Sequence, residues 1–140
     1  MAIDDIARTD VVTTHREQSA GNLATVMSEE GVGSVIVEED DRPVGIVTDR
    51  DLVIEVLEPR ADPREVTAGE IMTPDPATVP THAGVFEVAE TMFDASVRRV
   101  PVVDERGSIA GIVTLDDFLV LFTDELGSLA GVIEAESPPY

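Results

Sequence analysis

The sequence of 140 residues contains no cysteine, no lysine and no tryptophan. Without cysteine, the chain can form no disulfide bond, no thiolate metal site and no cysteine nucleophile. Aromatic residues make up only 4% of the chain, so we expect a core built from Val, Ile, Leu, Ala and Met. No apolar run approaches the length that spans a bilayer, and no signal-peptide pattern is present, which leads us to expect a soluble, cytoplasmic protein.

Positive charge is also scarce. The nine basic residues are all arginine and stand against 29 acidic residues, which gives a net charge of −20. Because the acidic residues are spread along the chain, binding to nucleic acid or to an acidic membrane surface is disfavoured. The absence of lysine in so acidic a chain favours a halophilic protein, because the Debye length falls to about 3 Å at 1 M salt and self-repulsion is screened.

One segment occurs twice. Gly45 to Leu52 reads GIVTDRDL and Gly111 to Phe118 reads GIVTLDDF, at an offset of 66, and the preceding segments match at an offset of 65. The one-residue difference falls in a polar stretch, where a turn can absorb it. Each copy has about 60 residues, near the lower limit for a stable core, so we expect the two copies to pack on each other. Function is therefore sought in a pseudo-symmetric pair.

Each copy is predicted to run β-α-β-β-α, which makes the fold class mixed α/β (α+β). Apolar residues at helical spacing predict the first helices, with the stripes Ala20, Leu23, Ala24, Met27 and Val85, Val88, Ala89, Met92. Val- and Ile-rich runs predict strands at 35–37, 44–47, 100–103 and 109–113, and second helices begin at Thr48 and Thr114. The expected division is repeat 1 at 3–58, a linker at 59–68, repeat 2 at 69–123, a helical extension at 124–136 and an irregular end at 137–140.

The duplicated pattern G-h-h-T-x-x-D, where h is apolar, resembles the CBS domain, and the tandem pair resembles a Bateman module. The resemblance is carried by Gly45–Thr48 with Asp51 and by Gly111–Thr114 with Asp117, and it covers about residues 3–123. It implies binding of AMP, ADP, ATP or an S-adenosyl compound in clefts between the repeats, with no required cofactor. It also implies that two modules pair into a disc-like homodimer.

The resemblance assigns roles to individual residues. The aspartates would accept the ribose hydroxyls, the threonines would contact phosphate or ribose, and basic residues before the hairpin strand would reach phosphate. The alternative for each T-x-x-D is a helix capping box, and for each arginine a solvated surface position. The candidate ligand-binding residues are Thr48, Asp51, Thr114, Asp117, Arg99, Arg98 and Arg50.

The two copies differ at these sites. Gly33-Ser34 stands in the first copy where the second has Arg98-Arg99, and Ile6-Ala7-Arg8-Thr9 stands where the second has Ile71-Met72-Thr73-Pro74. We therefore expect two chemically unequal clefts, one of which is empty.

The predicted function is that of a regulatory adenine-nucleotide sensor that acts in trans on an unknown effector protein. One alternative is a ligand-free structural dimerisation module. An enzyme is disfavoured, because His15 and His82 lack the partners of a catalytic triad, and they also lack the ligand spacing of a zinc site.

Overall fold

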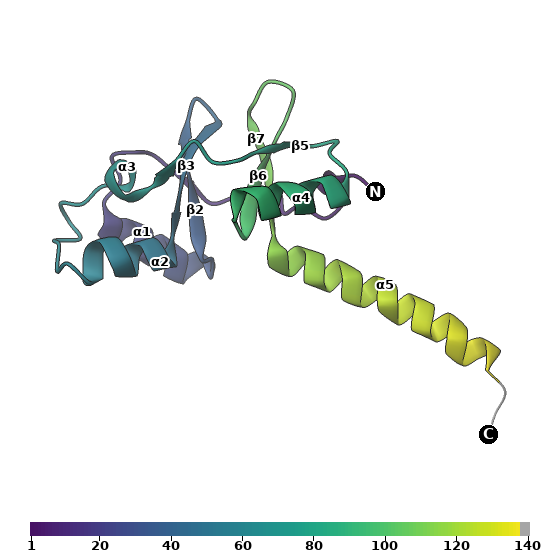
Figure 1. Cartoon of the computed structure of the whole chain (residues 1–140). Coiled ribbons are helices and arrows are strands. Elements are labelled where there is room, and N and C mark those ends of the chain that lie inside the picture. Colours follow the sequence, from purple (N-terminus) through teal and green to yellow (C-terminus); the bar gives the residue numbers. More distant parts are fainter. Residues whose placement is uncertain (138–140) are drawn as a thin grey trace.

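The structure is a computed structural model that describes residues 1–137, so most of the irregular end expected at 137–140 lies outside the described residues. Two small sheets lie side by side with helices around them (Figure 1). The first sheet has the order β1 (Thr13–Thr14), β2 (Ser34–Glu39), β3 (Arg42–Thr48), β4 (Thr73–Pro74). The second has the order β5 (Val79–Pro80), β6 (Arg99–Val103), β7 (Ile109–Thr114). The predicted mixed α+β fold is confirmed.

The two hairpins β2–β3 and β6–β7 are equivalent and differ only in their turns. Asp40 and Asp41 have φ values of 52° and 63°, as a two-residue hairpin turn with matching twist requires. The second turn is longer and uses Gly107, whose φ is 82°. Because Val37 pairs with Gly45 and Val102 pairs with Gly111, the extra residue of the second repeat lies in this turn, as expected.

The first helices, α1 (Ala20–Glu30) and α4 (Val85–Ala95), each bury one stripe against a sheet. The predicted stripe is correct for Leu23 and Met27 and for their counterparts in α4. It is wrong for Ala24, which is exposed and lines a shallow apolar groove beside the second helix of the repeat.

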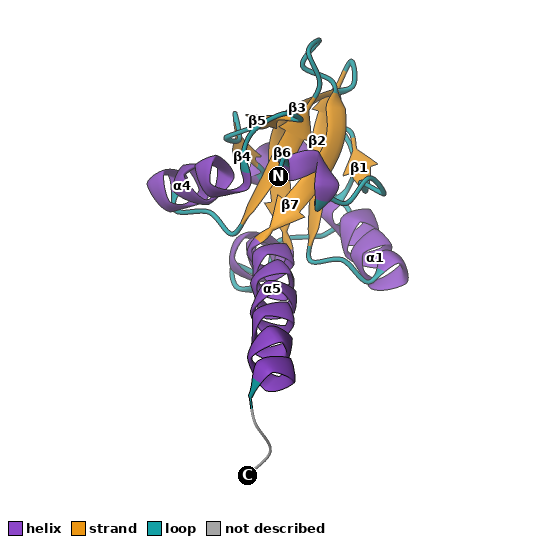
Figure 2. Cartoon of the chain, turned by 90° about the vertical axis from the view of Figure 1, so that its right-hand side faces the viewer, coloured by secondary structure: helices purple, strands orange, loops and turns teal. Residues whose placement is uncertain are grey.

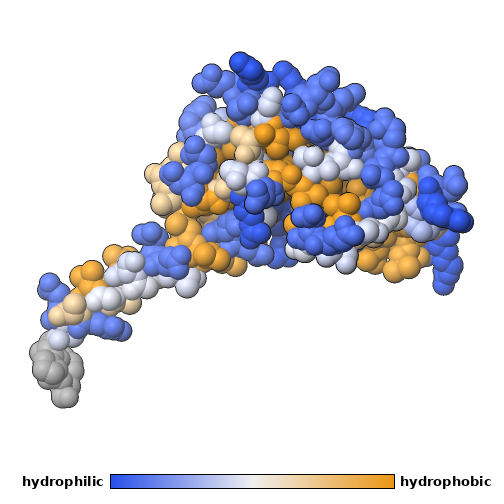
Figure 3. Space-filling view, turned by 180° about the vertical axis from the view of Figure 1, so that it is seen from behind, coloured by the Kyte–Doolittle hydropathy of each residue, from blue (hydrophilic) through white to orange (hydrophobic). Residues whose placement is uncertain are grey.

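The second helices differ sharply in length. In the first repeat, α2 (Asp49–Leu52) continues as a short π-helix, η2 (Val53–Leu57), which ends before the linker. In the second repeat, α5 (Leu115–Glu136) is one helix of 22 residues, so the helix predicted at 124–136 continues the repeat helix without a break. Its C-terminal part projects from the body (Figures 1 and 2), with hydrophobic residues on its surface (Figure 3).

The repeats exchange the segments that precede them. The short 3-10 helix η1 (Ile3–Asp5) places Ile3 in the core of the second repeat, and α3 (Ala68–Ile71) places Ala68 in the core of the first. The same backbone hydrogen bond forms at equivalent positions, from Ile3 N to Ala83 O at 2.7 Å and from Ala68 N to Gln18 O at 2.8 Å. Each core therefore needs a segment from the other repeat, and the pair forms one folding unit.

The exchange explains the glycine that opens each G-h-h-T motif. The strand β4 pairs antiparallel with β3 at Gly45, where an added Cβ would lie 2.3 Å from Met72 Sδ. At the equivalent Gly111, an added Cβ would lie 2.8 Å from the backbone oxygen of Arg8. Arg8 also exchanges two backbone hydrogen bonds of 2.9 Å with Ile112. Only glycine allows this close approach.

No helix within residues 1–137 is long and apolar enough to cross a membrane.

Candidate functional site

A cleft of about 1000 Å³ opens where the two repeats meet, and both repeats line it. The ends of β3 and β7, the starts of the helices that follow them and the two exchanged segments form its walls. Six of the seven predicted ligand-binding residues line the cleft: Thr48, Asp51, Arg50, Thr114, Arg98 and Arg99. Asp117 does not line it.

Both T-x-x-D motifs form the capping box that was the alternative interpretation. Asp51 N donates to Thr48 Oγ1 at 3.1 Å, and Thr48 N donates to Asp51 Oδ2 at 2.8 Å. The second motif repeats the pattern, with Thr114 N donating to Asp117 Oδ2 at 2.8 Å. These bonds satisfy backbone N–H groups that a helix start leaves unpaired, so the motifs have a structural role whether or not a ligand binds.

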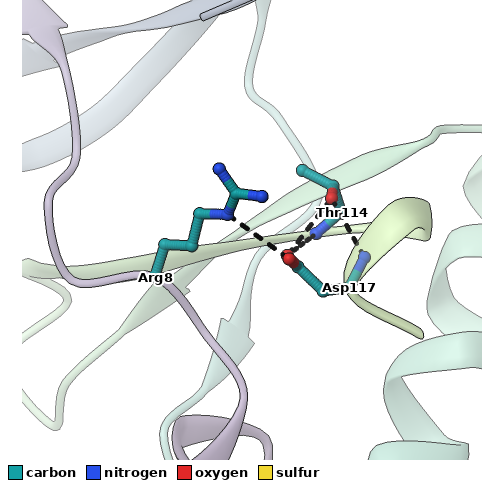
Figure 4. Close-up of polar contacts among 3 residues, drawn as sticks. All are labelled: Arg8, Thr114 and Asp117. Atoms are coloured by element: carbon teal, nitrogen blue, oxygen red, sulfur yellow. Dashed lines mark hydrogen bonds and ion pairs between the residues drawn. The ribbon is translucent and has the colours of Figure 1, made fainter. Parts of the chain in front are cut away.

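The two carboxylates differ in how many acceptor sites they retain. Arg8 Nε donates to Asp117 Oδ1 at 3.3 Å, and Thr114 binds the other oxygen through both its N–H and its hydroxyl group (Figure 4). The Asp117 side chain is only 12% exposed. Within residues 1–137, Asp51 accepts only the Thr48 N–H bond. A carboxylate can accept about four hydrogen bonds, so Asp51 has the greater free capacity.

The adjacent arginines lie beside the start of α5. Arg99 pairs with Thr114 across the hairpin, and the Arg98 carbonyl accepts a bond of 2.8 Å from Leu115 N. Arg98 is exposed and Arg99 is half-buried, and neither forms an ion pair within residues 1–137. The N-terminus of a long helix carries a partial positive charge, which adds to that of the two guanidinium groups. This part of the cleft suits an anion.

The equivalent position in the first repeat is less basic. Ser34 pairs with Thr48 as Arg99 pairs with Thr114, and Asp49 N donates to the Gly33 carbonyl at 3.0 Å. Only Arg50, exposed on the first turn of α2, adds positive charge there. The two ends of the cleft therefore have the same backbone geometry but different charge.

Arginine is concentrated in this cleft. Four of the nine arginines of the chain line it, whereas only five of the 29 acidic residues do. The four are Arg8, Arg50, Arg98 and Arg99. In a chain with a net charge of −20, the cleft is thus nearly neutral and is locally positive beside Arg98 and Arg99.

Sequence analysis did not identify Arg8 as a site residue. It lines the cleft and holds Asp117, although the two residues are 109 positions apart. The repeat makes Arg8 equivalent to Thr73, and the structure shows that both residues line the cleft. The sequence signal was therefore the position of Arg8 in the segment that precedes the first repeat. Only the exchange of the preceding segments places Arg8 beside the second T-x-x-D motif.

The two histidines lie away from the cleft lining. His15 is exposed, with Nε2 3.8 Å from Glu38 Oε1, and His82 is exposed on the second repeat. The described part of the chain contains no group of three or more acidic or histidine side chains that could hold a metal ion.

Comparisons with known proteins agree with the architecture. The family model of the CBS domain matches residues 3–58 and 68–124. The chain is 42% identical over 120 residues to an uncharacterized protein of Methanopyrus kandleri, covering 85% of this chain and 61% of that protein. It is 36% identical over 114 residues to hypoxic response protein 1 of Mycobacterium tuberculosis, covering 81% of this chain and 79% of that protein.

Two solved structures have the same fold. Hypoxic Response Protein I, solved with two coordinated zinc ions, superposes with a TM-score of 0.76 at 33% identity, covering 85% of this chain and 97% of that chain. The CBS domain pair of protein MJ0100, in complex with 5′-methylthioadenosine and S-adenosyl-L-methionine, superposes with a TM-score of 0.80 at 27% identity. That match covers 89% of this chain and 98% of the other. Since the family model accounts for both repeats, the chain belongs to the CBS domain family and contains a tandem pair of CBS domains.

Proposed function

We propose that this CBS pair binds an adenine nucleotide in the cleft between its repeats and signals its occupancy to an effector protein. The observation that carries the proposal is the concentration of arginine in this cleft of a strongly acidic chain. An anionic ligand gains charge-assisted hydrogen bonds there that the rest of the surface does not offer. The candidate ligands are AMP, ADP, ATP and S-adenosyl compounds, and both ligands of protein MJ0100 contain adenosine.

The phosphate groups would lie beside Arg98 and Arg99, at the N-terminus of α5. Two guanidinium groups and the partial positive charge of a helix start form a favourable phosphate site. Arg8 supports this site by neutralising Asp117, which would otherwise repel a phosphate group. The first-repeat end, where Asp51 retains acceptor capacity, supplies an acceptor for ribose hydroxyls.

The base would pack on the apolar part of the lining. Ile36 and Ile46 of the first sheet and Ile112 of the second contribute to the cleft walls. Side chains of this type exclude water from the face of a purine, and the polar groups at the helix starts then fix its orientation.

The test uses the difference between the repeats. Arg99→Ser installs the residue of the equivalent position 34, and it removes one guanidinium group from the cleft. Arg64→Ser is the matched control, because Arg64 is an exposed linker residue outside the cleft. Within residues 1–137 its one ion pair is with Asp62, whose pKa the side-chain hydrogen bond from Arg64 lowers. Both variants change the net charge equally.

Calorimetric titrations with ATP, AMP and S-adenosylmethionine should be run in molar KCl. Arg99→Ser should weaken ATP binding about tenfold or more, because a hydrogen bond to a charged group contributes about 1.5–3 kcal/mol. Binding of S-adenosylmethionine, which has no phosphate, should change little, and Arg64→Ser should behave as wild type. No binding of any of these ligands by the wild-type protein would reject the sensor and favour the structural dimerisation module.

A further inference from the structure

Arg8 and Thr73 occupy equivalent positions beside the two T-x-x-D motifs. Arg8 pairs antiparallel with Ile112, two positions before the threonine of the second motif. Thr73 pairs in the same way with Ile46, two positions before the threonine of the first motif. Both residues are exposed, and both line the cleft. The backbone is therefore matched at the two ends, but one end receives a long guanidinium side chain and the other a short hydroxyl group.

The carboxylate beside Arg8 has both oxygens engaged. Arg8 Nε donates to Asp117 Oδ1 at 3.3 Å, and Oδ2 accepts the N–H and the hydroxyl group of Thr114. Asp117 lies outside the cleft lining, with only 12% of its side chain exposed. The two hydroxyl groups of a ribose would have to displace a charge-assisted hydrogen bond to reach this carboxylate.

The carboxylate beside Thr73 is open. Asp51 lines the cleft, and within residues 1–137 its side chain accepts only the hydrogen bond from Thr48 N to Oδ2, at 2.8 Å. In the same part of the chain, Thr73 donates no hydrogen bond to Asp51, so no group corresponding to Arg8 engages Oδ1. An ionised carboxylate in this state can accept two adjacent hydroxyl groups.

We propose that Arg8 is a specificity-determining residue that limits the cleft to one nucleoside, bound with its ribose at Asp51. The proposal rests on the proposed function, since it requires an adenine nucleoside in this cleft. Arg8 closes the second ribose position by holding Asp117 through Nε. Its other guanidinium nitrogens form no hydrogen bond within residues 1–137, and Arg8 lines the cleft, so they are free to contact phosphate. One side chain thus excludes a second ribose and favours a phosphorylated ligand.

The test counts bound molecules of 5′-methylthioadenosine, which has both ribose hydroxyl groups but no phosphate. Calorimetric titration of the full chain in molar KCl should give one molecule per chain for the wild type. Arg8→Thr installs the residue of the equivalent position 73, and it should raise the count to two by freeing Asp117. Adding Asp117→Asn to that variant should return the count to one. Arg64→Thr removes the same charge outside the cleft and should behave as wild type.

The reciprocal variant, Thr73→Arg, places a guanidinium group beside Asp51. It should weaken binding of 5′-methylthioadenosine about tenfold or more, because the ribose then competes with a charge-assisted hydrogen bond. Arg8 and Thr73 are exposed, and both substitutions leave the backbone pairing of these residues in place, so neither variant should lose its fold.

Two results would overturn the proposal alone. They are a wild-type count other than one and an unchanged count in Arg8→Thr, in each case with ATP or AMP still bound by the wild-type protein. Unchanged affinity in Thr73→Arg would overturn it as well, because the side chain at this position would then not control access to the carboxylate. If the wild-type protein binds neither 5′-methylthioadenosine nor AMP nor ATP, the proposed function fails and this inference fails with it.

Discussion

The close approach at Gly111 is a sharp test of the segment exchange. In Gly111→Ala, the new Cβ would lie 2.8 Å from the backbone oxygen of Arg8, a distance that real Cβ atoms essentially never show. If the segment stays in place, overpacking costs about 1–3 kcal/mol. If it moves away, both backbone hydrogen bonds between Arg8 and Ile112 are lost, which costs about 1–3 kcal/mol at 0.5–1.5 kcal/mol each. Either route lowers the free energy of unfolding by about 2 kcal/mol.

Gly45→Ala is the matched comparison, because its obstacle is a side chain. The new Cβ would lie 2.3 Å from Met72 Sδ and 2.8 Å from Met72 Cγ. Met72→Ala removes both atoms and leaves only Cβ, at 3.0 Å. In the Met72→Ala background, Gly45→Ala should therefore lower the free energy of unfolding much less than it does in the wild type. No truncation at Arg8 can rescue Gly111→Ala, since Arg8→Ala retains the backbone oxygen.

The assay is urea unfolding followed by circular dichroism in molar KCl, arranged as two double-mutant cycles. The cycle of Gly45 with Met72 should show a large coupling energy, and the cycle of Gly111 with Arg8 should show none from the clash. A Gly111→Ala variant with the wild-type urea midpoint would refute the close approach. Rescue of that variant by Arg8→Ala would refute the assignment of the obstacle to the backbone.

Three further predictions concern the site, the salt response and the tail. Asp51→Ala should weaken nucleotide binding about tenfold or more by calorimetry, through loss of charge-assisted hydrogen bonds to the ribose hydroxyls. Asp51→Asn, which keeps an oxygen for the Thr48 N–H, separates that effect from loss of the helix cap. Unchanged affinity in both variants would remove Asp51 from the site. The melting temperature should rise steeply from dilute buffer to molar KCl, because the Debye length is about 30 Å at 0.01 M and the net charge is −20; a flat response would reject halophilic adaptation. We expect a homodimer that residues 124–136 help to hold, so truncation after Thr123 should weaken the assembly in sedimentation. An unchanged oligomer would show that 124–136 is not an assembly element.

Local sequence patterns predicted the elements of the fold well. Helical spacing of apolar residues located the buried faces of α1 and α4, and the Val- and Ile-rich runs located the hairpin strands. Helical periodicity wrongly predicted that Ala24 is buried. The pattern indicates which side of a helix is apolar, but it does not show how much of that side the sheet covers. It also placed a boundary within α5 at residue 124, since the end of a repeat does not require the end of a helix.

The sequence alone also identified six residues that line the cleft, because the duplicated T-x-x-D motif marks two equivalent helix starts. It could not show that Asp117 is held by Arg8, or that Asp51 keeps the greater free acceptor capacity. Equal motifs have unequal surroundings here, and those surroundings come from segments outside the motif. The individual roles in nucleotide binding remain predictions.

The sequence by itself thus determined the repeat, its secondary structure and the pair of capping motifs, all of which depend on residues within a few positions of one another. Only the tertiary structure decided that each repeat packs the segment preceding the other, with Ile3 in the second core and Ala68 in the first. The same exchange brought Arg8 to Asp117 and gathered four arginines in one cleft. Neighbours such as these are tens of residues apart in the chain. A local sequence pattern cannot predict such contacts. They depend on the tertiary arrangement that buries the apolar residues of both repeats and brings the preceding segments close to Gly45 and Gly111.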